Sequence, residues 1–295
     1  MYGLIKEIDG RTRLCGLIGY PVKHTMSPVI HNYLAQVLDN QLVYVPFEVA
    51  DNLKQAVEGA FALNVLGMNV TVPYKKAVMD SLVCVDENAQ RIGAVNTLVR
   101  MEHGYKGYNT DYLGLKRAMQ EDGIPIEGQT IVVLGAGGAA NAVVYMCAQA
   151  GAETIYLLNR TFETAKQLAE RVRKYFPETK LIPMKLEDYG KLPDEPMTAI
   201  QTTSVGLAPD CGRAVIEDEA FYKKINRAVD IIYNPGETLF MKKVREQGGY
   251  ACNGLKMLLY QGITAYELWN DLTVDSEVCR RTFEMLEKQL GSQEA

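Results

Sequence analysis

The chain has few of the residues on which metal centres and disulfide frameworks depend. Only three of its 295 residues are histidine, and its six cysteines are scattered, with no close pair at metal-binding or redox spacing. His24 and His31 have no carboxylates at a spacing that would complete a metal site, so we interpret both as structural. These absences argue against a zinc or iron enzyme and indicate reduced, mostly buried thiols in a reducing compartment. We therefore expect no metal.

Long apolar runs and basic runs are also missing. No stretch of about eighteen uncharged apolar residues occurs, and Lys6, Glu7 and Asp9 lie where a secretory signal would need an apolar core. The net charge of −5 argues against nucleic acid and anionic membranes as partners. The single tryptophan, Trp269, is interpreted as helix core. We expect a folded, soluble, cytoplasmic protein, as a monomer or homodimer, that binds a small molecule.

A glycine-rich turn between two apolar segments is the clearest architectural signal. Residues 130–134 form a continuous apolar run, residues 135–140 read Gly-Ala-Gly-Gly-Ala-Ala, and a helix that ends near residue 150 is predicted to follow. A second apolar run, 154–158, lies at the distance expected for a right-handed βαβ crossover, and neither run alternates, as in buried parallel strands. The pattern predicts an α/β protein with a Rossmann-type doubly wound parallel sheet.

The same turn has the G-x-G-x-x-A spacing of dinucleotide-binding loops. Gly135 permits a tight turn, Gly137 lets the backbone approach a pyrophosphate, and Ala140 allows close helix packing. The start of the helix offers unpaired N–H groups to the anion. We predict that the cofactor contacts Gly135, Ala136, Gly137, Gly138 and Ala139. A glycine turn with a purely structural role is the alternative.

The second apolar run ends in Asn159, Arg160 and Thr161, where an NAD enzyme usually has an acidic residue on the ribose. The planar fork of an arginine suits a 2′-phosphate and stacks on adenine. The sequence therefore favours NADP, with a solvated surface role for Arg160 as the alternative.

The N-terminal part is predicted to form a separate α/β lobe. Residues 42–49 and 66–72 have the pattern of strands, and residues 27–38 and 51–62 that of helices. Ser27 followed by Pro28 fits an N-cap with proline at the first helical position. The breaker cluster at 123–128 indicates a domain boundary or hinge, and residues 254–290 read as two helices.

Polar side chains gather in three segments of this lobe, residues 19–32, 69–75 and 107–111. They supply hydroxyls, amides, an amine and a carboxylate, which suits a small polyhydroxylated ligand. Residues 69, 71, 73 and 75 alternate along an extended segment, and Pro73 then frees the chain to turn Lys75 inward. Lys75 is the best candidate for transferring the proton of a secondary alcohol, and a surface lysine is the alternative. Asp111 precedes a predicted helix that starts at about Tyr112 and, taken alone, reads as an N-cap.

The order and the sequences of these segments resemble those of the shikimate dehydrogenase family, which reduces 3-dehydroshikimate to shikimate with a nicotinamide cofactor. The resemblance extends from residue 16 to about residue 269. It implies that Lys75 and Asp111 are the catalytic pair. It also implies a substrate-binding catalytic lobe at residues 1–112, completed by helices in 254–295, and a dinucleotide-binding domain at 113–253.

The resemblance further assigns binding residues. Those implied for the substrate are Thr25, Ser27, Thr71, Asn96, Thr110, Tyr233 and Gln261. Those implied for the cofactor, besides the glycine turn, are Asn159, Arg160, Thr161, Thr203, Val205, Ile231, Gly254 and Met257.

Two departures from the family pattern leave alternatives open. Thr25 replaces the first of two serines, which leaves quinate open as a substrate besides shikimate. Thr164, next to Glu163, stands where a second basic residue is often found, which leaves NAD or dual cofactor use open beside NADP. A non-catalytic sensor on the same fold and a folate-type dehydrogenase are the alternatives from outside this activity. If Lys75 is the base, alcohol oxidation is expected to accelerate as the pH rises.

Overall fold

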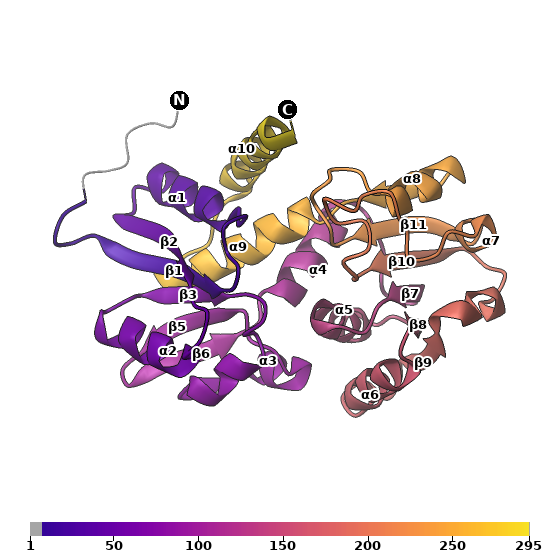
Figure 1. Ribbon diagram of the computed structural model, residues 1–295, viewed down its shortest axis with the longest axis horizontal. Helices are drawn as coiled ribbons and strands as arrows, with labels where there is room; N and C mark the ends of the chain where they lie inside the picture. Colours follow the sequence, from indigo (N-terminus) through magenta and orange to yellow (C-terminus); the bar gives the residue numbers. More distant parts are fainter. Residues whose placement is uncertain (1–7, 295) are drawn as a thin grey trace. The chain divides into compact units, whose positions relative to one another are not determined.

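The computed structural model describes residues 8–294, so Lys6 and Glu7 lie outside the described residues. It divides into two compact units. Unit 1 comprises Met1–Thr110 and Leu259–Ala295, and unit 2 comprises Asp111–Leu258 (Figure 1). The sequence predicted boundaries after residues 112 and 253, whereas the two units divide after Thr110 and after Leu258. Each unit has its own sheet and its own hydrophobic core.

Unit 1 is built mainly from the N-terminal part of the chain. Its elements, in chain order, are β1 (Arg13–Gly19), α1 (Ser27–Val37), β2 (Leu42–Glu48), α2 (Leu53–Ala62), β3 (Gly67–Val70), η1 (Ala77–Ser81), β4 (Cys84–Val85), α3 (Glu87–Ile92), β5 (Thr97–Met101), β6 (Gly104–Tyr108), α9 (Leu255–Asn270) and α10 (Ser276–Glu294). The division between the units falls inside α9, after Leu258.

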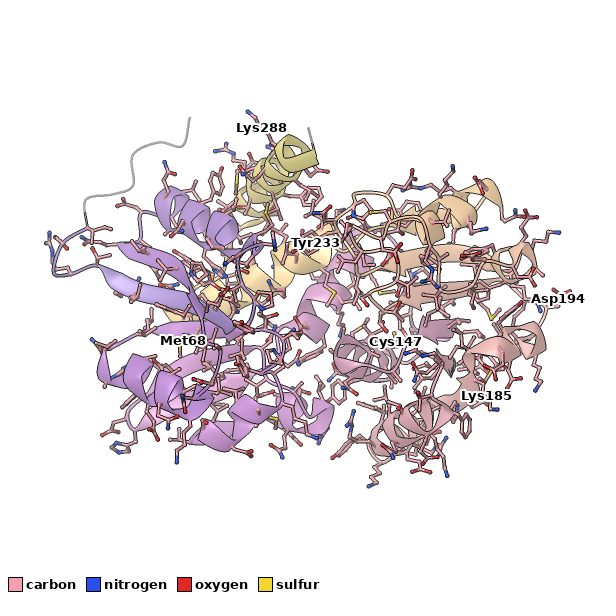
Figure 2. All side chains as sticks on the ribbon, in the orientation of Figure 1. Met68, Cys147, Lys185, Asp194, Tyr233 and Lys288 are labelled. Atoms are coloured by element: carbon pink, nitrogen blue, oxygen red, sulfur yellow. The ribbon has the colours of Figure 1, made fainter. Side chains whose placement is uncertain are left out.

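The sheet of unit 1 is mixed, with strand order β2-β1-β3-β5-β6-β4. β1 pairs in parallel with β2 and β3, while β5 runs antiparallel to β3 and β6. Met68, labelled in Figure 2, is fully buried in the core of this unit. Trp269 of α9 donates its indole N–H to the Leu98 carbonyl at 2.9 Å, and a Cβ atom at Gly67 would lie 2.1 Å from that nitrogen. Trp269 is thus the core residue that the sequence predicted.

Two local predictions for unit 1 are wrong. The strand predicted at 66–72 ends at Val70, because the Thr71 carbonyl accepts a hydrogen bond from the Tyr74 N–H at 2.9 Å and closes a turn. Ser27 is the first residue of α1 rather than its N-cap, and the cap position is held by Met26 without a side-chain bond. The reason is local, since the Ser27 hydroxyl is hydrogen-bonded to Thr25 Oγ1 at 3.2 Å.

Unit 2 is the middle of the chain. Its elements, in chain order, are α4 (Asp111–Glu121), β7 (Thr130–Leu134), α5 (Gly138–Gln149), β8 (Thr154–Asn159), α6 (Phe162–Arg173), β9 (Lys180–Lys185), η2 (Leu186–Lys191), β10 (Met197–Gln201), α7 (Glu219–Tyr222), β11 (Ile225–Asp230), α8 (Leu239–Glu246) and β12 (Tyr250–Cys252). Strands β7 and β8 coincide with the two apolar runs of the sequence, and α5 ends where expected.

All strand pairings in the unit 2 sheet are parallel. The strand order is β9-β8-β7-β10-β11-β12, which is the 3-2-1-4-5-6 order of the doubly wound dinucleotide-binding sheet. The order reverses between β7 and β10, so their carboxyl ends border the crevice in which such sheets bind ligands. The predicted Rossmann-type fold is confirmed.

The breaker cluster at 123–128 does not mark the division between the units. It forms the connection from α4 to β7 within unit 2, with Gly123 and Gly128 both at positive φ. α4 belongs to unit 2 because the Tyr112 and Tyr145 rings are in edge contact at 5.7 Å and because Lys256 pairs with Glu121 at 3.0 Å.

The cysteines are all free thiols, but fewer are buried than the sequence suggested. Cys15, Cys147 and Cys279 are buried, whereas Cys84 is exposed because β4 is a two-residue strand at the end of the sheet order. Within residues 8–294, no helix combines the length and the apolar character needed to cross a membrane.

Candidate active site

The glycine turn of unit 2 leaves the start of α5 open. Gly135 has a φ of +105°, and a Cβ atom there would lie 2.7 Å from Thr202 Oγ1, so the position requires glycine. Within residues 8–294, no atom apart from the adjoining backbone lies within 4 Å of a Cβ atom added at Gly137 or Gly138, and no side chain caps α5. A helix start with free space and uncapped N–H groups fits a pyrophosphate.

The residues predicted to bind the adenosine half follow β8. Asn159 donates its side-chain N–H to the Thr161 carbonyl at 2.9 Å, which shapes the turn into α6. Arg160 and Thr161 are exposed, as are Glu163 and Thr164 in the first turn of α6. The turn therefore presents the guanidinium of Arg160 to solvent at the strand end, where a 2′-phosphate would be bound.

Two further loops follow β10 and β11 and contain the predicted residues Thr203, Val205 and Ile231. Gln201 ends β10, and its carbonyl oxygen Oε1 accepts the Thr203 N–H. Asp230 ends β11, and its Oδ1 atom accepts the Ile232 N–H at 3.0 Å. Neither Gln201 nor Asp230 was assigned a role from the sequence.

The start of α9 packs tightly on the loop after β11. A Cβ atom at Gly254 would lie 2.1 Å from the Ile231 carbonyl oxygen, so only glycine fits, and the Gly254 N–H donates to the Ile232 carbonyl at 2.9 Å. The Asn253 side chain donates to the Gly236 carbonyl at 2.9 Å. Like Gln201 and Asp230, Asn253 was not assigned a role from the sequence. Met257 is half-buried. Tyr233, labelled in Figure 2, is half-buried, and this burial raises the pKa of its phenol.

In unit 1, Thr25 and Ser27 lie together before and at the start of α1. The Thr25 hydroxyl donates to the Ser27 hydroxyl at 3.2 Å and accepts the Ser27 N–H at 3.2 Å. The side chain of Ser27 is buried and that of Thr25 is half-buried. The hydrogen bonds within the pair therefore orient both hydroxyl groups, which suits the prediction that these side chains bind the substrate.

Asn96 and Thr110 form a second pair, from the segments before β5 and after β6. Asn96 Oδ1 accepts the Thr110 N–H at 2.6 Å, and Asn96 Nδ2 donates to Thr110 Oγ1 at 3.0 Å. Thr97 Oγ1 lies 3.1 Å from Thr110 Oγ1. All three side chains are buried, so these contacts fix both predicted substrate residues in one orientation.

A buried network connects this pair to α1 and β2. Asn69 Nδ2 donates to Thr97 Oγ1 at 3.2 Å and to the Asn96 carbonyl at 3.4 Å, which identifies the other amide atom as the oxygen. That oxygen accepts the Tyr44 hydroxyl at 2.8 Å and lies 3.1 Å from His31 Nε2. His31 therefore carries its proton on Nε2.

Burial governs the titration of this network. It lowers the pKa of His31 to about 3 and raises that of Tyr44 well above its ordinary value. Both groups are neutral at pH 7 as a result. The His31 ring stacks on Tyr44 with centroids 4.2 Å apart, and its buried Nδ1 atom has no hydrogen-bond partner among the residues that the structure describes. The structural interpretation of His31 from the sequence fits these contacts.

Lys75 lies in the turn that follows β3. Its side chain is half-buried, unlike that of the neighbouring Lys76, which is exposed. The Lys75 carbonyl accepts the Val95 N–H at 2.7 Å, so its backbone is held beside the segment that carries Asn96. Thr71 lies near Gly19, where a Cβ atom would be 2.3 Å from the Thr71 methyl group.

The remaining predicted residues are Gln261 and Asp111. Gln261 is buried on α9, and the next residue, Gly262, lies close to α1, since a Cβ atom there would be 3.7 Å from His31 Nε2. Asp111 is the first residue of α4 and of unit 2, and it directly follows Thr110. It lies in the first turn of that helix. A carboxylate in that turn still complements the helix dipole.

No group of three or more histidine, cysteine, aspartate or glutamate side chains within residues 8–294 is arranged to hold a metal ion. An all-parallel sheet with an open glycine turn in unit 2, together with the many buried hydroxyls and amides of unit 1, defines the class of the protein as an α/β oxidoreductase that binds a dinucleotide.

Comparison with known families identifies the chain more closely. Residues 17–98 match the shikimate dehydrogenase substrate binding domain, and residues 117–194 match shikimate / quinate 5-dehydrogenase. The chain belongs to the shikimate dehydrogenase family.

Individual relatives match over nearly the whole chain. Shikimate dehydrogenase (NADP(+)) of Desulforamulus reducens is 41% identical over 97% of this chain and 98% of its own length. A shikimate dehydrogenase solved with NADP+ has a TM-score of 0.87 and 34% identity, covering 96% of this chain and 98% of the other. Shikimate 5-dehydrogenase of Listeria monocytogenes, solved with shikimate and NAD, has a TM-score of 0.86 and 31% identity, covering 94% and 98%.

Proposed function

We propose that this protein catalyses the reversible, NADP-dependent reduction of 3-dehydroshikimate to shikimate. The observation that carries the proposal is the 41% identity over 97% of the chain to a protein named shikimate dehydrogenase (NADP(+)). The arrangement of the residues supports it, because the polar side chains of unit 1 suit a polyol and the sheet of unit 2 suits a dinucleotide.

Lys75 is proposed as the general acid and base, with Asp111 as its partner. When bound, the cofactor supplies or accepts the hydride. Lys75 donates a proton to the carbonyl oxygen in the reduction and takes it from the hydroxyl in the oxidation. The half-buried position of Lys75 and the backbone bond to Val95 support this role, since they restrict where its amine can reach.

The other polar groups of unit 1 are proposed to orient the substrate. The Thr25 and Ser27 hydroxyls hold the carboxylate, and Asn96 and Thr110 bind ring hydroxyls. Their mutual hydrogen bonds support these roles, because a pre-oriented donor loses little entropy when it binds a ligand. Thr71, Gln261 and Tyr233 are proposed to complete the substrate contacts.

Unit 2 is proposed to hold NADP through residues that follow its strands. The open start of α5 binds the pyrophosphate, and Arg160 binds the 2′-phosphate. Thr203 and Val205 are proposed to border the cofactor and Ile231 its nicotinamide, and Gly254 and Met257 are proposed to contact the cofactor as well. NAD is the alternative cofactor, because Thr164 and Glu163 add no second positive charge beside Arg160.

A single assay tests both the substrate and the cofactor. Shikimate and quinate are each oxidised with NADP and with NAD, and the near-ultraviolet absorbance of the reduced nicotinamide is followed. We expect turnover mainly with shikimate and NADP. Equal or faster turnover with quinate or NAD would assign the chain to the quinate or dual-cofactor branch. Binding of shikimate without turnover under any combination would instead support a sensor.

A cytoplasmic location and a monomeric or homodimeric state stay predictions. Light scattering on the purified full chain tests the second of them directly.

A further inference from the structure

Two loops of unit 2 are connected through one buried carboxylate. Asp230 is the last residue of β11, and its side chain is fully buried. Its Oδ1 atom accepts the Ile232 N–H at 3.0 Å and the Gln201 side-chain N–H at 3.3 Å. Its Oδ2 atom accepts the Thr238 hydroxyl at 2.7 Å. The carboxylate thereby holds the loop at 231–236 near its start, through Ile232, and just beyond its end, through Thr238.

Gln201 extends this connection to the neighbouring loop at 202–206. Its side-chain nitrogen also donates to the Val205 carbonyl at 3.2 Å, and its side-chain oxygen accepts the Thr203 N–H. The Thr203 hydroxyl accepts the Val205 N–H at 3.2 Å and completes the turn. Asp230 and Gln201 together therefore fix the two loops relative to each other.

The three partners of the Asp230 carboxylate are neutral, so they do not fully offset the cost of burying its charge. Burial raises the pKa of Asp230 to about 6, although all three hydrogen bonds act in the opposite direction. Tyr222 responds to this carboxylate, since its pKa is raised chiefly by burial and also by Glu217 and Asp230. An amide or hydroxyl at this position would stabilise the fold at lower cost.

A second aspartate, Asp218, accepts similar hydrogen bonds at an exposed position that does not connect the two loops. Asp218 accepts the Ala220 N–H at 2.9 Å and the Tyr189 hydroxyl at 2.9 Å, two of the three kinds of donor that Asp230 accepts. It is exposed, caps α7 and precedes β11 rather than following it. Its two partners lie on η2 and α7 and not on the loops at 202–206 and 231–236, so Asp218 is a matched control for Asp230.

We propose that Asp230 is a positioning residue for the cofactor, acting with Gln201 to set the loops at 202–206 and 231–236 against the nicotinamide half of the dinucleotide. The inference rests on the proposed function, in which Thr203, Val205 and Ile231 border the cofactor. A carboxylate suits this task because it only accepts hydrogen bonds, and the loops offer backbone and side-chain donors to it. Asparagine has the same size but replaces one acceptor by a donor, which faces the Thr238 hydroxyl.

The test measures NADP binding to the full chain by isothermal titration calorimetry, together with the melting temperature and the KM values for NADP and shikimate. Asp230→Asn should raise the Kd and the KM for NADP about tenfold, the effect of one lost charge-assisted hydrogen bond. We expect the KM for shikimate to stay within about twofold and the melting temperature at pH 7 not to fall, since an amide is buried at lower cost than a carboxylate. Asp218→Asn should leave NADP binding unaltered.

Titration with pH provides a readout that a merely structural role would not change. Below pH 6 the protonated Asp230 resembles asparagine, so the ratio of the variant's Kd to that of the unmodified protein should fall toward one. Protonation of the NADP 2′-phosphate affects both proteins and cancels in this ratio.

Three results would overturn the inference: an unchanged Kd in Asp230→Asn, an equal loss in Asp218→Asn, or a constant ratio across the pH range. If Asp230→Asn does not fold, Thr238→Val is measured instead, and it should weaken NADP binding in the same direction. Absence of NADP binding to the unmodified protein would refute the proposed function itself. Normal NADP binding without shikimate turnover would refute only the proposed substrate.

Discussion

Each unit contains a network of buried polar side chains close to the ends of its strands, and the two networks differ in charge. In unit 1, His31 and Tyr44 each bond to Asn69, and all three are neutral at pH 7, since burial lowers the pKa of His31 to about 3 and raises that of Tyr44. In unit 2, burial raises the pKa of Asp230 only to about 6, so its carboxylate is ionised at pH 7.

The difference follows from the groups that each network holds. The unit 1 network orients side chains that both donate and accept, and amides and hydroxyls supply both functions without charge. The unit 2 network collects donors from two loops, which an acceptor-only carboxylate satisfies. Unit 1 should therefore keep its geometry over a wide pH range, whereas unit 2 carries a charge that titrates just below neutrality.

The largest expected effect separates chemistry from binding. Lys75→Ala should lower kcat about 10³-fold, the usual contribution of a general acid or base, while shikimate and NADP still bind. Steady-state kinetics and calorimetric titration measure the two quantities. Lys76→Ala, which changes the exposed neighbour, is the control and should keep full activity. A Lys75→Ala protein with near-normal kcat would exclude Lys75 as the proton donor.

The next effect breaks the neutral network of unit 1. Asn69→Ala leaves the Tyr44 hydroxyl, the Thr97 hydroxyl and the Asn96 carbonyl with fewer partners in a buried space. We expect the free energy of unfolding to fall by about 3 kcal/mol, measured by urea denaturation. Asn226→Ala removes an exposed strand asparagine and should change stability by less than about 0.5 kcal/mol. Equal effects of the two substitutions would show that the buried network contributes nothing.

A third substitution affects unit 2 alone. Arg160→Ala should raise the KM for NADP about 30-fold, because a charge-assisted phosphate contact contributes about 2 kcal/mol, and should leave the KM for NAD unchanged. Lys174→Ala, at the other end of α6, controls for the lost positive charge. Parallel changes for NADP and NAD would show that Arg160 does not contact the 2′-phosphate.

The parts of the fold that depend on contiguous residues were predictable. The glycine turn and the apolar runs at 130–134 and 154–158 specify a strand, a helix and a strand, and the observed parallel order follows from that unit. The division between the units was not predictable from the breakers at 123–128. It depends on α4 packing against α5, a contact between distant side chains that no local pattern records.

The candidate site divides in the same way. Some site residues lie in segments with distinctive sequence motifs, among them Lys75, Asn96 and Gly254. The structure shows why Gly254 must be glycine. Asp230 was missed because it looks like an ordinary polar residue at the end of a strand. Its partners Gln201 and Thr238 lie on other segments, so only the folded chain reveals the network.

The charge difference between the networks predicts opposite responses to acid. The native pKa of Asp230 is raised, so the native state binds its proton more tightly than the unfolded state, and this contribution to stability is lost as the pH rises through 6. Between pH 7 and pH 4, the unmodified protein should gain about 2 kcal/mol of unfolding free energy relative to Asp230→Asn. Urea denaturation of both proteins at each pH measures the difference. Asp218→Asn provides the control, and a difference that does not vary with pH would show that Asp230 does not titrate in this range.

His31 should respond with the opposite sign. Its native pKa is lowered to about 3, so the unfolded state takes up the proton first, and stability is lost as the pH falls below about 6.5. His31→Phe removes the titrating ring, including the buried Nδ1 atom without a partner, and keeps an aromatic ring to stack on Tyr44. Between pH 7 and pH 5, the unmodified protein should lose about 2 kcal/mol of unfolding free energy relative to this variant. The exposed His103, replaced by Phe, should show no such trend. If His31→Phe and the unmodified protein lose stability in parallel, the ring is protonated in the folded state, and the contrast between a neutral unit 1 and a charged unit 2 fails.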